Sequence, residues 1–499
     1  MADHHADAAV DIPCQVSKST GSPGRDSGLF ASRLPTEIYQ MIVDHIALHY
    51  DESSNDQKAI RAKTLSSLAR TSTTFQCLTE PYLYSFPEGS RMESSQGLER
   101  FQLSLAVSSR RENLVQVLDF EWDTKVYSRM VIIDIARRCP NLRTLKLTFP
   151  DKASPGDVFS QAHVDNLADL FFVCPKVKKL RISTYYGEVL PIPEQDGKIA
   201  EFAGQLSHVE MNGGGAWFKT AILPYLSPNV TSFTMIRANI HGYEDLSGFL
   251  KTLGQRCPVL ERLKIMCWGV TQVEVAALCK AVGSTLKLLY LHGDFEYDGN
   301  DDGSILSQFL PHMQVLEHVL LGNGFPLRVK DMDAMSSLSH LRTFIAEDNS
   351  YNESDSDDEN EPAQFFRGET LIDVDRALVR FLSTHRTTLE TMWLISCDCD
   401  LGEDVFQSLK LVRNLRSVGM DWNYEIGREE VDALLEACPK LRGAPDIENY
   451  VDEMFGVEDE WKSRYLWIVY DHLEWFENDY PQSDTGWAIS LRQPQRSID

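Results

Sequence analysis

The chain has 499 residues and a formal net charge of −26 at pH 7, with 74 acidic residues against 48 basic ones. Its hydrophobic content of 43% and charged content of 24% are typical of a globular protein. The negative charge disfavours a general nucleic-acid surface, which needs Lys and Arg to neutralise phosphates, and it disfavours adsorption to an anionic membrane. Partners with basic surfaces are favoured.

The N-terminal sequence MADHHADAAVDIPCQ has no basic segment followed by an apolar one, so we expect no signal peptide. No apolar run approaches the ~20 residues that a membrane helix requires. The ten cysteines lack the spacing of a disulfide framework and are expected to be reduced thiols. These features favour a cytoplasmic or nuclear protein that binds no membrane.

Residues 1–28 are polar and rich in Ser and Gly, which predicts disorder. Residues 29–86 are predicted to form a short domain of three helices. Pro35 suits the first turn of a helix because its missing amide hydrogen is not needed there, and the carboxylate of Glu37 suits the positive helix end. One apolar stripe of the first helix contains Ile38, Met41, Ile42 and Ile46.

The polar segment DESSNDQ separates this helix from two further apolar patterns. Helical spacing places four small or apolar residues on one face of a second helix: Leu65, Leu68, Ala69 and Ser72. A short third element is supplied with apolar groups by Phe75, Leu78, Tyr82 and Leu83.

Eleven stretches repeat one pattern of three apolar residues. Two variable positions separate the first apolar residue from the second, and one variable position separates the second from the third. The clearest is Leu142, Leu145 and Leu147. Successive units mostly start about 24–35 residues apart, a spacing typical of leucine-rich repeats. The sequence therefore predicts an α/β fold in which a solenoid spans residues 112–449, with a parallel sheet on its concave face.

A helical pattern precedes many of these strands and ends at a Cys-Pro pair. In the clearest unit Ile132, Ile133, Ala136 and Cys139 fall at helical spacing, and Pro140 ends the helix. The same ending recurs at Cys174, Cys257 and Cys438. These cysteines lie tens of residues apart, so we expect buried thiols at helix ends and no metal ligands.

Two segments depart from the repeat pattern. Residues 347–361 hold eight acidic residues in fifteen and are predicted to form a solvated, disordered insertion, in which Ser354 and Ser356 are candidates for phosphorylation. Residues 450–480 are acidic and aromatic, and we expect them to cap the last repeat; an aromatic protein-binding lobe is the alternative. Residues 481–499 form a tail.

Alternate residues of a strand face opposite ways, so the position between the last two apolar residues of each unit points outward, onto the concave face. These central positions change from polar to apolar along the chain. The early cations Lys146, Arg181 and Lys264 are suited to acidic or phosphorylated target residues, or to neutralising the acidic insertion. The later run is predicted to be exposed and to anchor a target protein, unless the C-terminal cap or the insertion covers it; it consists of Tyr290, Leu320, Ile345 and Trp393.

Ligand and catalytic motifs are incomplete. The segment from Asp298 to Gly303 is similar to the start of a calcium loop, but Phe309 occupies the position of the bidentate Glu. The glycines 213–215 are followed by Lys219, yet Phe218 stands where a phosphate loop requires Gly, so a flexible turn is predicted. We expect no metal, cofactor or catalytic group, and an enzyme is the weakest alternative.

Residues 34–84 resemble an F-box. The family's opening Leu-Pro-x-Glu-Ile is present as Leu34, Pro35, Glu37 and Ile38, and the ending PYLYS at 81–85 is similar to that of fungal members. The second-helix segment corresponds to 65–70. Two departures are Thr74-Phe75, where members often have Arg and an aromatic residue, and an insertion at 51–63. With its Cys-Pro-x-Leu repeats, the chain resembles the F-box proteins with leucine-rich repeats.

This resemblance implies a non-catalytic subunit of an SCF-type cullin–RING ubiquitin ligase, without a cofactor. The helical domain would bind a Skp-type adaptor, and the repeats would hold an unidentified protein for ubiquitin-dependent degradation. The candidate adaptor contacts are Leu34, Pro35, Glu37, Ile38, Ile42, Leu65 and Leu68; for Ile42 and Leu68, packing inside the domain is an equal alternative. The other function considered is a repeat scaffold outside any ligase, whose N-terminal helices only cap the solenoid.

Overall fold

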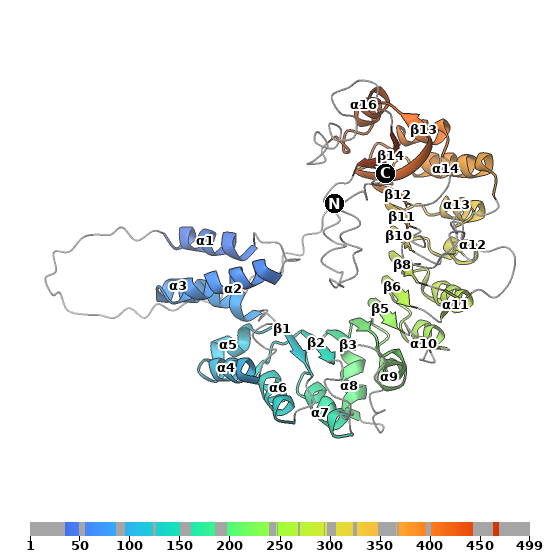
Figure 1. The fold of residues 1–499 in the computed structure, drawn as a ribbon. Helices are drawn as coiled ribbons and strands as arrows, with labels where there is room; N and C mark the ends of the chain where they lie inside the picture. Colours follow the sequence, from blue (N-terminus) through green and yellow to red (C-terminus); the bar gives the residue numbers. More distant parts are fainter. Residues whose placement is uncertain are drawn as a thin grey trace, which may run out of the picture. The chain divides into compact units, whose positions relative to one another are not determined.

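A computed structural model of the chain (Figure 1) describes residues 35–48, 55–85, 95–122, 126–149, 161–184, 197–238, 246, 248–267, 270–293, 295–296, 306–322, 327–347, 366, 369–395, 401–442 and 463–468. The predicted disorder at 1–28, the calcium-like segment, nearly all of the acidic insertion and the tail at 481–499 lie outside the described residues. The chain divides into two compact units, Met1–Val117 and Leu118–Asp499.

The first unit contains all three helices that the sequence predicts: α1 (Thr36–Leu48), α2 (Asn55–Ala69) and α3 (Thr73–Ser85). Val43, Ala47 and Leu65 form its buried core, against which apolar residues of α1 and α3 pack: Ile46, Phe75, Leu78, Tyr82 and Leu83. Two more helices, α4 (Ser95–Ala106) and α5 (Ser109–Leu114), complete the unit. By this division the helical unit ends at Val117.

The second unit is built on one large sheet whose strands follow chain order, and all of them except the last are parallel. The sheet contains β1 (Val117–Glu121), β2 (Thr144–Phe149), β3 (Lys179–Thr184), β4 (His208–Asn212), β5 (Ser232–Ala238), β6 (Arg262–Cys267), β8 (Leu288–His292), β10 (His318–Leu321), β11 (Thr343–Glu347), β12 (Thr391–Ile395), β13 (Ser417–Ile426) and the antiparallel β14 (Ser463–Ile468). A separate pair of short strands consists of β7 (Val270–Thr271) and β9 (Phe295–Glu296).

Helices connect successive strands and form a second layer beside the sheet (Figure 1). They are α6 (Val126–Arg138), α7 (Gln161–Phe172), α8 (Gly197–Gln205), α9 (Gly215–Ala221), α10 (Phe249–Arg256), α11 (Gln272–Val282), α12 (Leu306–Phe309), α13 (Val329–Met335), α14 (Leu371–His385), α15 (Glu403–Leu409) and α16 (Arg428–Ala437). The result is an α/β fold whose strand order is compatible with a solenoid. Among the described helices, none combines the length and the apolarity needed to cross a membrane.

The repeated apolar residues explain this architecture. Every member of the eleven predicted triplets is at most 3% exposed. Equivalent members lie in register on adjacent strands, as Leu145, Leu180 and Val209 do on β2, β3 and β4. Full burial of such a side chain contributes about 1.5–3 kcal/mol, so each unit is stabilised by the neighbours on which it packs.

The cysteines that end helices are buried, as predicted. Burial raises the pKa of Cys174 and Cys257 to about 12 and that of Cys438 to about 11, so these thiols stay protonated at neutral pH. The thiol of Cys438 donates to the carbonyl oxygen of Val412 at 3.3 Å, in the preceding unit. These cysteines thus act as small packing groups between repeats.

The glycine-rich turn differs from its prediction. Gly213 and Gly214 have φ angles of +74° and +62°, and a Cβ on Gly213 would lie 2.4 Å from the carbonyl oxygen of Thr184. Only glycine tolerates both the left-handed backbone and this close approach. The segment is therefore a tight turn packed on β3, where a flexible one was expected.

The C-terminal strand lies at the end of the sheet, where a cap is predicted. β14 pairs antiparallel with β13, and Trp467 lies opposite Gly419 in the register. The last parallel strand therefore has a backbone partner on its outer side. The remaining residues of the predicted cap at 450–480 lie outside the described part of the chain.

Candidate protein-binding surfaces

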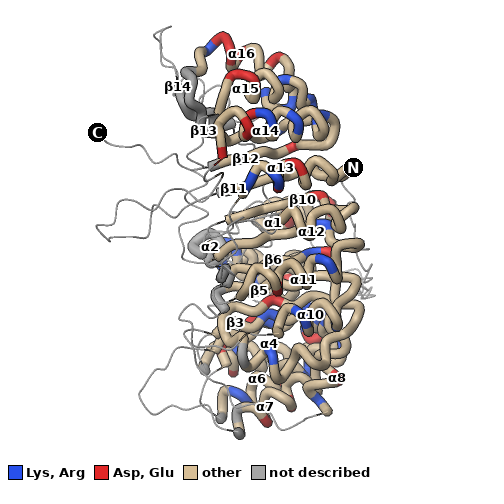
Figure 2. The backbone as a smooth tube through the Cα atoms, turned by 90° about the vertical axis from the view of Figure 1, so that its right-hand side faces the viewer, with Lys and Arg blue, Asp and Glu red and all other residues tan. Residues whose placement is uncertain are grey.

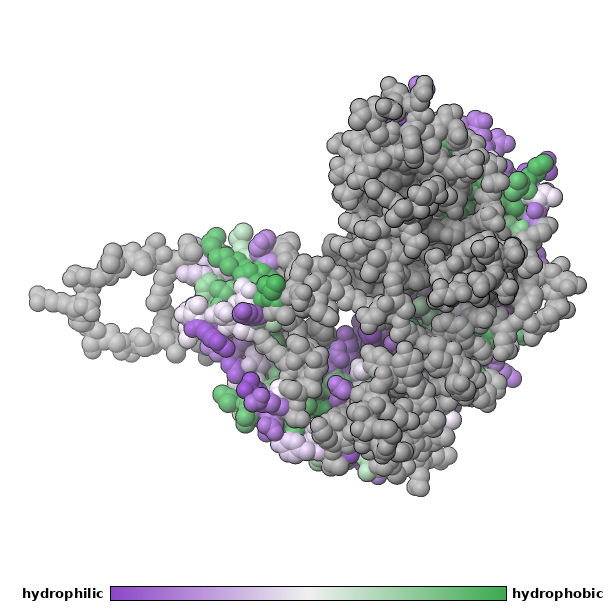
Figure 3. All heavy atoms as spheres, in the orientation of Figure 1, coloured by the Kyte–Doolittle hydropathy of each residue, from purple (hydrophilic) through white to green (hydrophobic). Residues whose placement is uncertain are grey.

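Helix α1 is apolar on two sides. On the inner side Val43 and Ala47 enter the core, and the ring of Tyr39 meets that of Phe75 edge-on at 5.0 Å between centroids. On the outer side three apolar residues remain accessible, with 38% of Ile38, 65% of Met41 and 39% of Ile42 exposed. We call these three residues the α1 face; Figure 3 shows apolar side chains gathered on the unit that contains them.

Polar contacts fix α1 to the other two helices of the unit. The hydroxyl of Tyr82 in α3 donates to Asp44 Oδ1 at 2.5 Å, and burial together with this bond raises the pKa of Tyr82 to about 12. Arg61 Nε in α2 donates to the carbonyl oxygen of Ala47 at 3.0 Å. The α1 face is therefore presented by a helix that is anchored along its length.

The predicted adaptor contacts differ in how exposed their side chains are. Pro35 and Glu37 are exposed, as are Ile38 and Ile42 of the α1 face. Leu68 is half-buried, whereas Leu65 is fully buried in the core, so the assignment of Leu65 to a surface contact is corrected. Leu34 lies outside the described residues.

Met41 is the most exposed member of the α1 face and is absent from the predicted contacts. The sequence signal that finds it is its spacing from Ile38, since residues three apart share one side of a helix.

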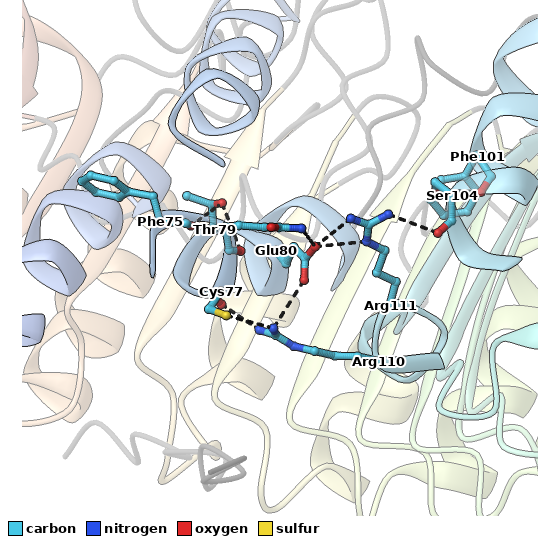
Figure 4. A network of polar contacts seen from close by, with 9 residues as sticks. Phe75, Cys77, Thr79, Glu80, Phe101, Ser104, Arg110 and Arg111 are labelled. Carbon is cyan, nitrogen blue, oxygen red and sulfur yellow. Dashed lines mark hydrogen bonds and ion pairs between the residues drawn. The ribbon is translucent and has the colours of Figure 1, made fainter. Parts of the chain in front are cut away.

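A network around Glu80 joins α3 to α5 (Figure 4). The Glu80 side chain is nearly buried, and its Oε1 accepts hydrogen bonds from Arg111 Nε at 3.0 Å and from Arg111 Nη2 at 2.9 Å. Gln76 Nε2 donates to the same oxygen at 3.0 Å, and Arg110 Nη1 lies 3.6 Å from Oε2. A nearly buried carboxylate therefore has cationic partners, which offset the cost of its desolvation.

The same arginines satisfy backbone carbonyls of neighbouring helices. Pro81 has no amide hydrogen to donate to the carbonyl of Cys77, four residues earlier in α3. Arg110 Nη2 donates to that oxygen at 2.8 Å in its place, and Arg111 Nη1 reaches the carbonyl oxygen of Ser104 in α4 at 3.3 Å. The arginines of α5 thus tie α3 and α4 together within the unit.

The outward side of the sheet is the second candidate surface. The predicted central positions lie opposite one another in the strand registers and form one continuous row, so the predicted phase of the strands is confirmed. We call it the central row; across β2 to β13 it consists of Lys146, Arg181, Glu210, Thr234, Lys264, Tyr290, Leu320, Ile345, Trp393 and Gly419.

The early part of the central row is accessible and charged. Lys146 Nζ lies 3.9 Å from Asp119 Oδ2, and Arg181 Nε lies 3.2 Å from Glu210 Oε1. All four side chains are partly exposed, so these ion pairs are weak and can exchange partners. Lys264 lies further along the row and is mostly buried.

The later part of the central row is buried, so the prediction that this apolar run is exposed is wrong. Tyr290, Leu320, Ile345 and Trp393 are at most 5% exposed. Side chains in register on strands about 4.8 Å apart pack on one another, and Trp393 Nε1 donates to Ser417 Oγ on the next strand at 2.8 Å. In the described state these four residues therefore cannot contact a target.

The phosphorylation candidates Ser354 and Ser356 lie outside the described residues. Among the residues that the structure describes, no group of three His, Cys, Asp or Glu side chains could hold a metal ion. A scan against protein-family models gives no match for the chain, and no curated protein matches it significantly.

Proposed function

We propose that the chain is the target-recognition subunit of an SCF-type cullin–RING ubiquitin ligase. The helical unit binds a Skp-type adaptor, and the second unit, as a leucine-rich-repeat solenoid, holds the protein to be degraded. The observation that carries this proposal is the α1 face, because it lies in the segment that resembles an F-box and leaves three apolar side chains accessible on an anchored helix.

The energetics of the α1 face suit a protein partner. Ile38, Met41 and Ile42 follow one another at spacings of three and four residues, so one partner surface can cover them together. Burying apolar surface contributes roughly 25 cal/mol per Å², and three such side chains supply several kcal/mol. Contiguous apolar residues on an accessible surface commonly mark a binding site.

In this proposal the chain carries out no chemistry. Its contribution is to hold a target close to the ubiquitin-loaded enzyme, which converts an encounter between two proteins into a reaction within one complex. The sheet supports this role, since its early strands present an accessible polar face on a scaffold with a buried core. The activity would take place in the cytoplasm or the nucleus.

The proposal is tested by co-purifying the full chain with a Skp-type adaptor. Wild type is expected to retain the adaptor, and the double variant Ile38→Ser/Ile42→Ser to lose it, because both side chains belong to the α1 face. Leu103→Ser is the control, since Leu103 is an even more exposed apolar residue of α4 in the same unit. Circular dichroism of each variant establishes that the fold is kept.

The alternative is a repeat scaffold outside any ligase, in which α1 to α3 only cap the N-terminal end of the sheet. A wild-type chain that fails to retain the adaptor favours this alternative. Equal retention by wild type and by the double variant contradicts the assignment of the α1 face as the contact.

A further inference from the structure

The outward side of the early strands carries most of its charge as cations, although Lys264 among them is mostly buried. We call five side chains of β2, β3 and β6 the basic patch: Lys146, Lys179, Arg181, Arg262 and Lys264. The carboxylates at outward positions of β1 to β6 are Asp119, Glu121 and Glu210. This face therefore carries more cations than carboxylates, whereas the whole chain has a net charge of −26.

The strand registers place the basic patch in two adjacent rows. Lys179 lies in one row with His208, Ser232 and Arg262, and Arg181 lies in the central row with Glu210, Thr234 and Lys264. Lys179 and Arg262 are the exposed members of these four, on β3 and β6. Three strand spacings separate them, about 14 Å.

The side chains between these two cations are polar. His208 and Ser232 are half-exposed, and the hydroxyl of Ser207 lies 2.9 Å from His208 Nδ1. An extended peptide rises about 3.3 Å per residue, so roughly four residues span the distance from Lys179 to Arg262. A peptide that crosses these strands can thus place one acidic group at each end and backbone groups over the polar middle.

Charge is distributed unevenly over the second unit. Acidic residues gather over α15 and α16, as Figure 2 shows. The first turns of these helices contain Glu403, Asp404, Glu429 and Glu430. The carboxylates of these two helices repel acidic segments, whereas the basic patch on the sheet attracts them.

We infer that the basic patch docks an acidic, extended segment of a target protein. The inference rests on the proposed function, since it names the class of target that the repeats would take. The carboxylate of Glu210 weakens binding of such a ligand, because it lies in the central row between Arg181 and Lys264 and repels acidic groups. It also competes with the ligand for Arg181, with which it forms an ion pair. Binding of the acidic segment releases Arg181 from that pair.

The test is fluorescence anisotropy of the full chain with a labelled octaglutamate peptide, and with octaglutamine as the uncharged probe. We expect wild type to bind octaglutamate and not octaglutamine. Lys179→Ala/Arg262→Ala is expected to weaken binding about tenfold, and Glu210→Gln to strengthen it about threefold. Raising the ionic strength weakens binding to wild type.

The matched control is Lys251→Ala/Lys280→Ala, which removes two exposed cations from α10 and α11 in the helix layer. Equal weakening by this control, or no binding of octaglutamate by wild type, overturns the inference. Adaptor co-purification of the same variants separates the two proposals, because the basic-patch variants leave the α1 face intact. A chain that keeps the adaptor and ignores octaglutamate refutes only the docking of acidic segments.

Discussion

The guanidinium of Arg342 donates from Nε at 3.0 Å and from Nη2 at 2.6 Å to a single carboxylate oxygen of Glu390, 48 residues later in the chain. The two residues stand directly before β11 and β12, on either side of the acidic insertion. Glu317 Oε2 lies 3.7 Å from Arg342 Nη1, and Arg416 Nε lies 3.6 Å from Glu390 Oε2. Residues at the starts of neighbouring strands thus alternate in sign and link one unit to the next.

We expect Glu390→Gln to lower the free energy of unfolding by about 1 kcal/mol, because both arginine partners lose their charged acceptor and solvent screens part of the effect. The measurement is urea denaturation of the full chain. Glu436→Gln is the control, since Glu436 is exposed on α16, and it should change the free energy of unfolding by less than about 0.5 kcal/mol. Equal effects of the two substitutions would refute the stabilising role of the Arg342–Glu390 pair.

The sheet was predictable from the sequence because its signal recurs in every unit. Each apolar triplet marks a strand, and the two-residue period of a strand then places the central row on the outward side. The alternation of Glu317, Arg342 and Glu390 was missed, although equivalent positions before successive strands carry opposite charges in the sequence.

The accessibility of individual side chains was harder to predict. Helical spacing places Ile38 and Ile42 on one side of α1 but does not say whether that side meets the core or the solvent. Leu65 satisfies the same kind of pattern and is fully buried. Likewise, the period of a strand shows that Tyr290 points outward, whereas its burial depends on what packs around it.

The Glu80 network predicts a strong dependence of the first unit on one carboxylate. Glu80→Ala is expected to destabilise the fold by about 3–5 kcal/mol, because Arg110 and Arg111 lose their acceptor in a largely buried site. Glu99→Ala on α4, a partly exposed carboxylate of the same unit, should cost less than about 1 kcal/mol. Thermal unfolding followed by circular dichroism gives both values, and similar midpoints for the two variants would argue against the network.

The glycines allow a graded test of the turn on β3. Gly213→Ala should destabilise the chain by more than about 2 kcal/mol, because the new Cβ collides with Thr184 and the backbone is left-handed. Gly248→Ala has a left-handed φ of +70° but open space around its Cβ, so about 1 kcal/mol is expected. Gly197 has neither a left-handed backbone nor an atom within 4 Å of an added Cβ, so Gly197→Ala should leave the stability unchanged or raise it. Denaturation midpoints in any other order contradict this account of the turn.

Buried histidines predict a loss of stability in mild acid. Burial lowers the pKa of His292 to about 4, below its ordinary value of 6.5. The unfolded chain therefore takes up the proton first, so the contribution of His292 is complete above about pH 6.5 and is lost as the pH falls toward 4. His292→Gln should flatten the decline of the melting temperature across this range, and the exposed His340→Gln should not. Parallel curves for wild type and His292→Gln would exclude His292 as a source of the decline.

The most direct test of the central claim is hydrogen–deuterium exchange of the full chain, with and without a Skp-type adaptor. If the α1 face is the contact, amides of α1 (Thr36–Leu48) gain protection when the adaptor is added, while those of α10 and α11 in the helix layer stay unchanged. Met41→Glu should abolish that gain, because it places a charge in the centre of the apolar face. Exchange in α1 that is the same with and without the adaptor would contradict the assignment of this chain to a ubiquitin ligase through α1.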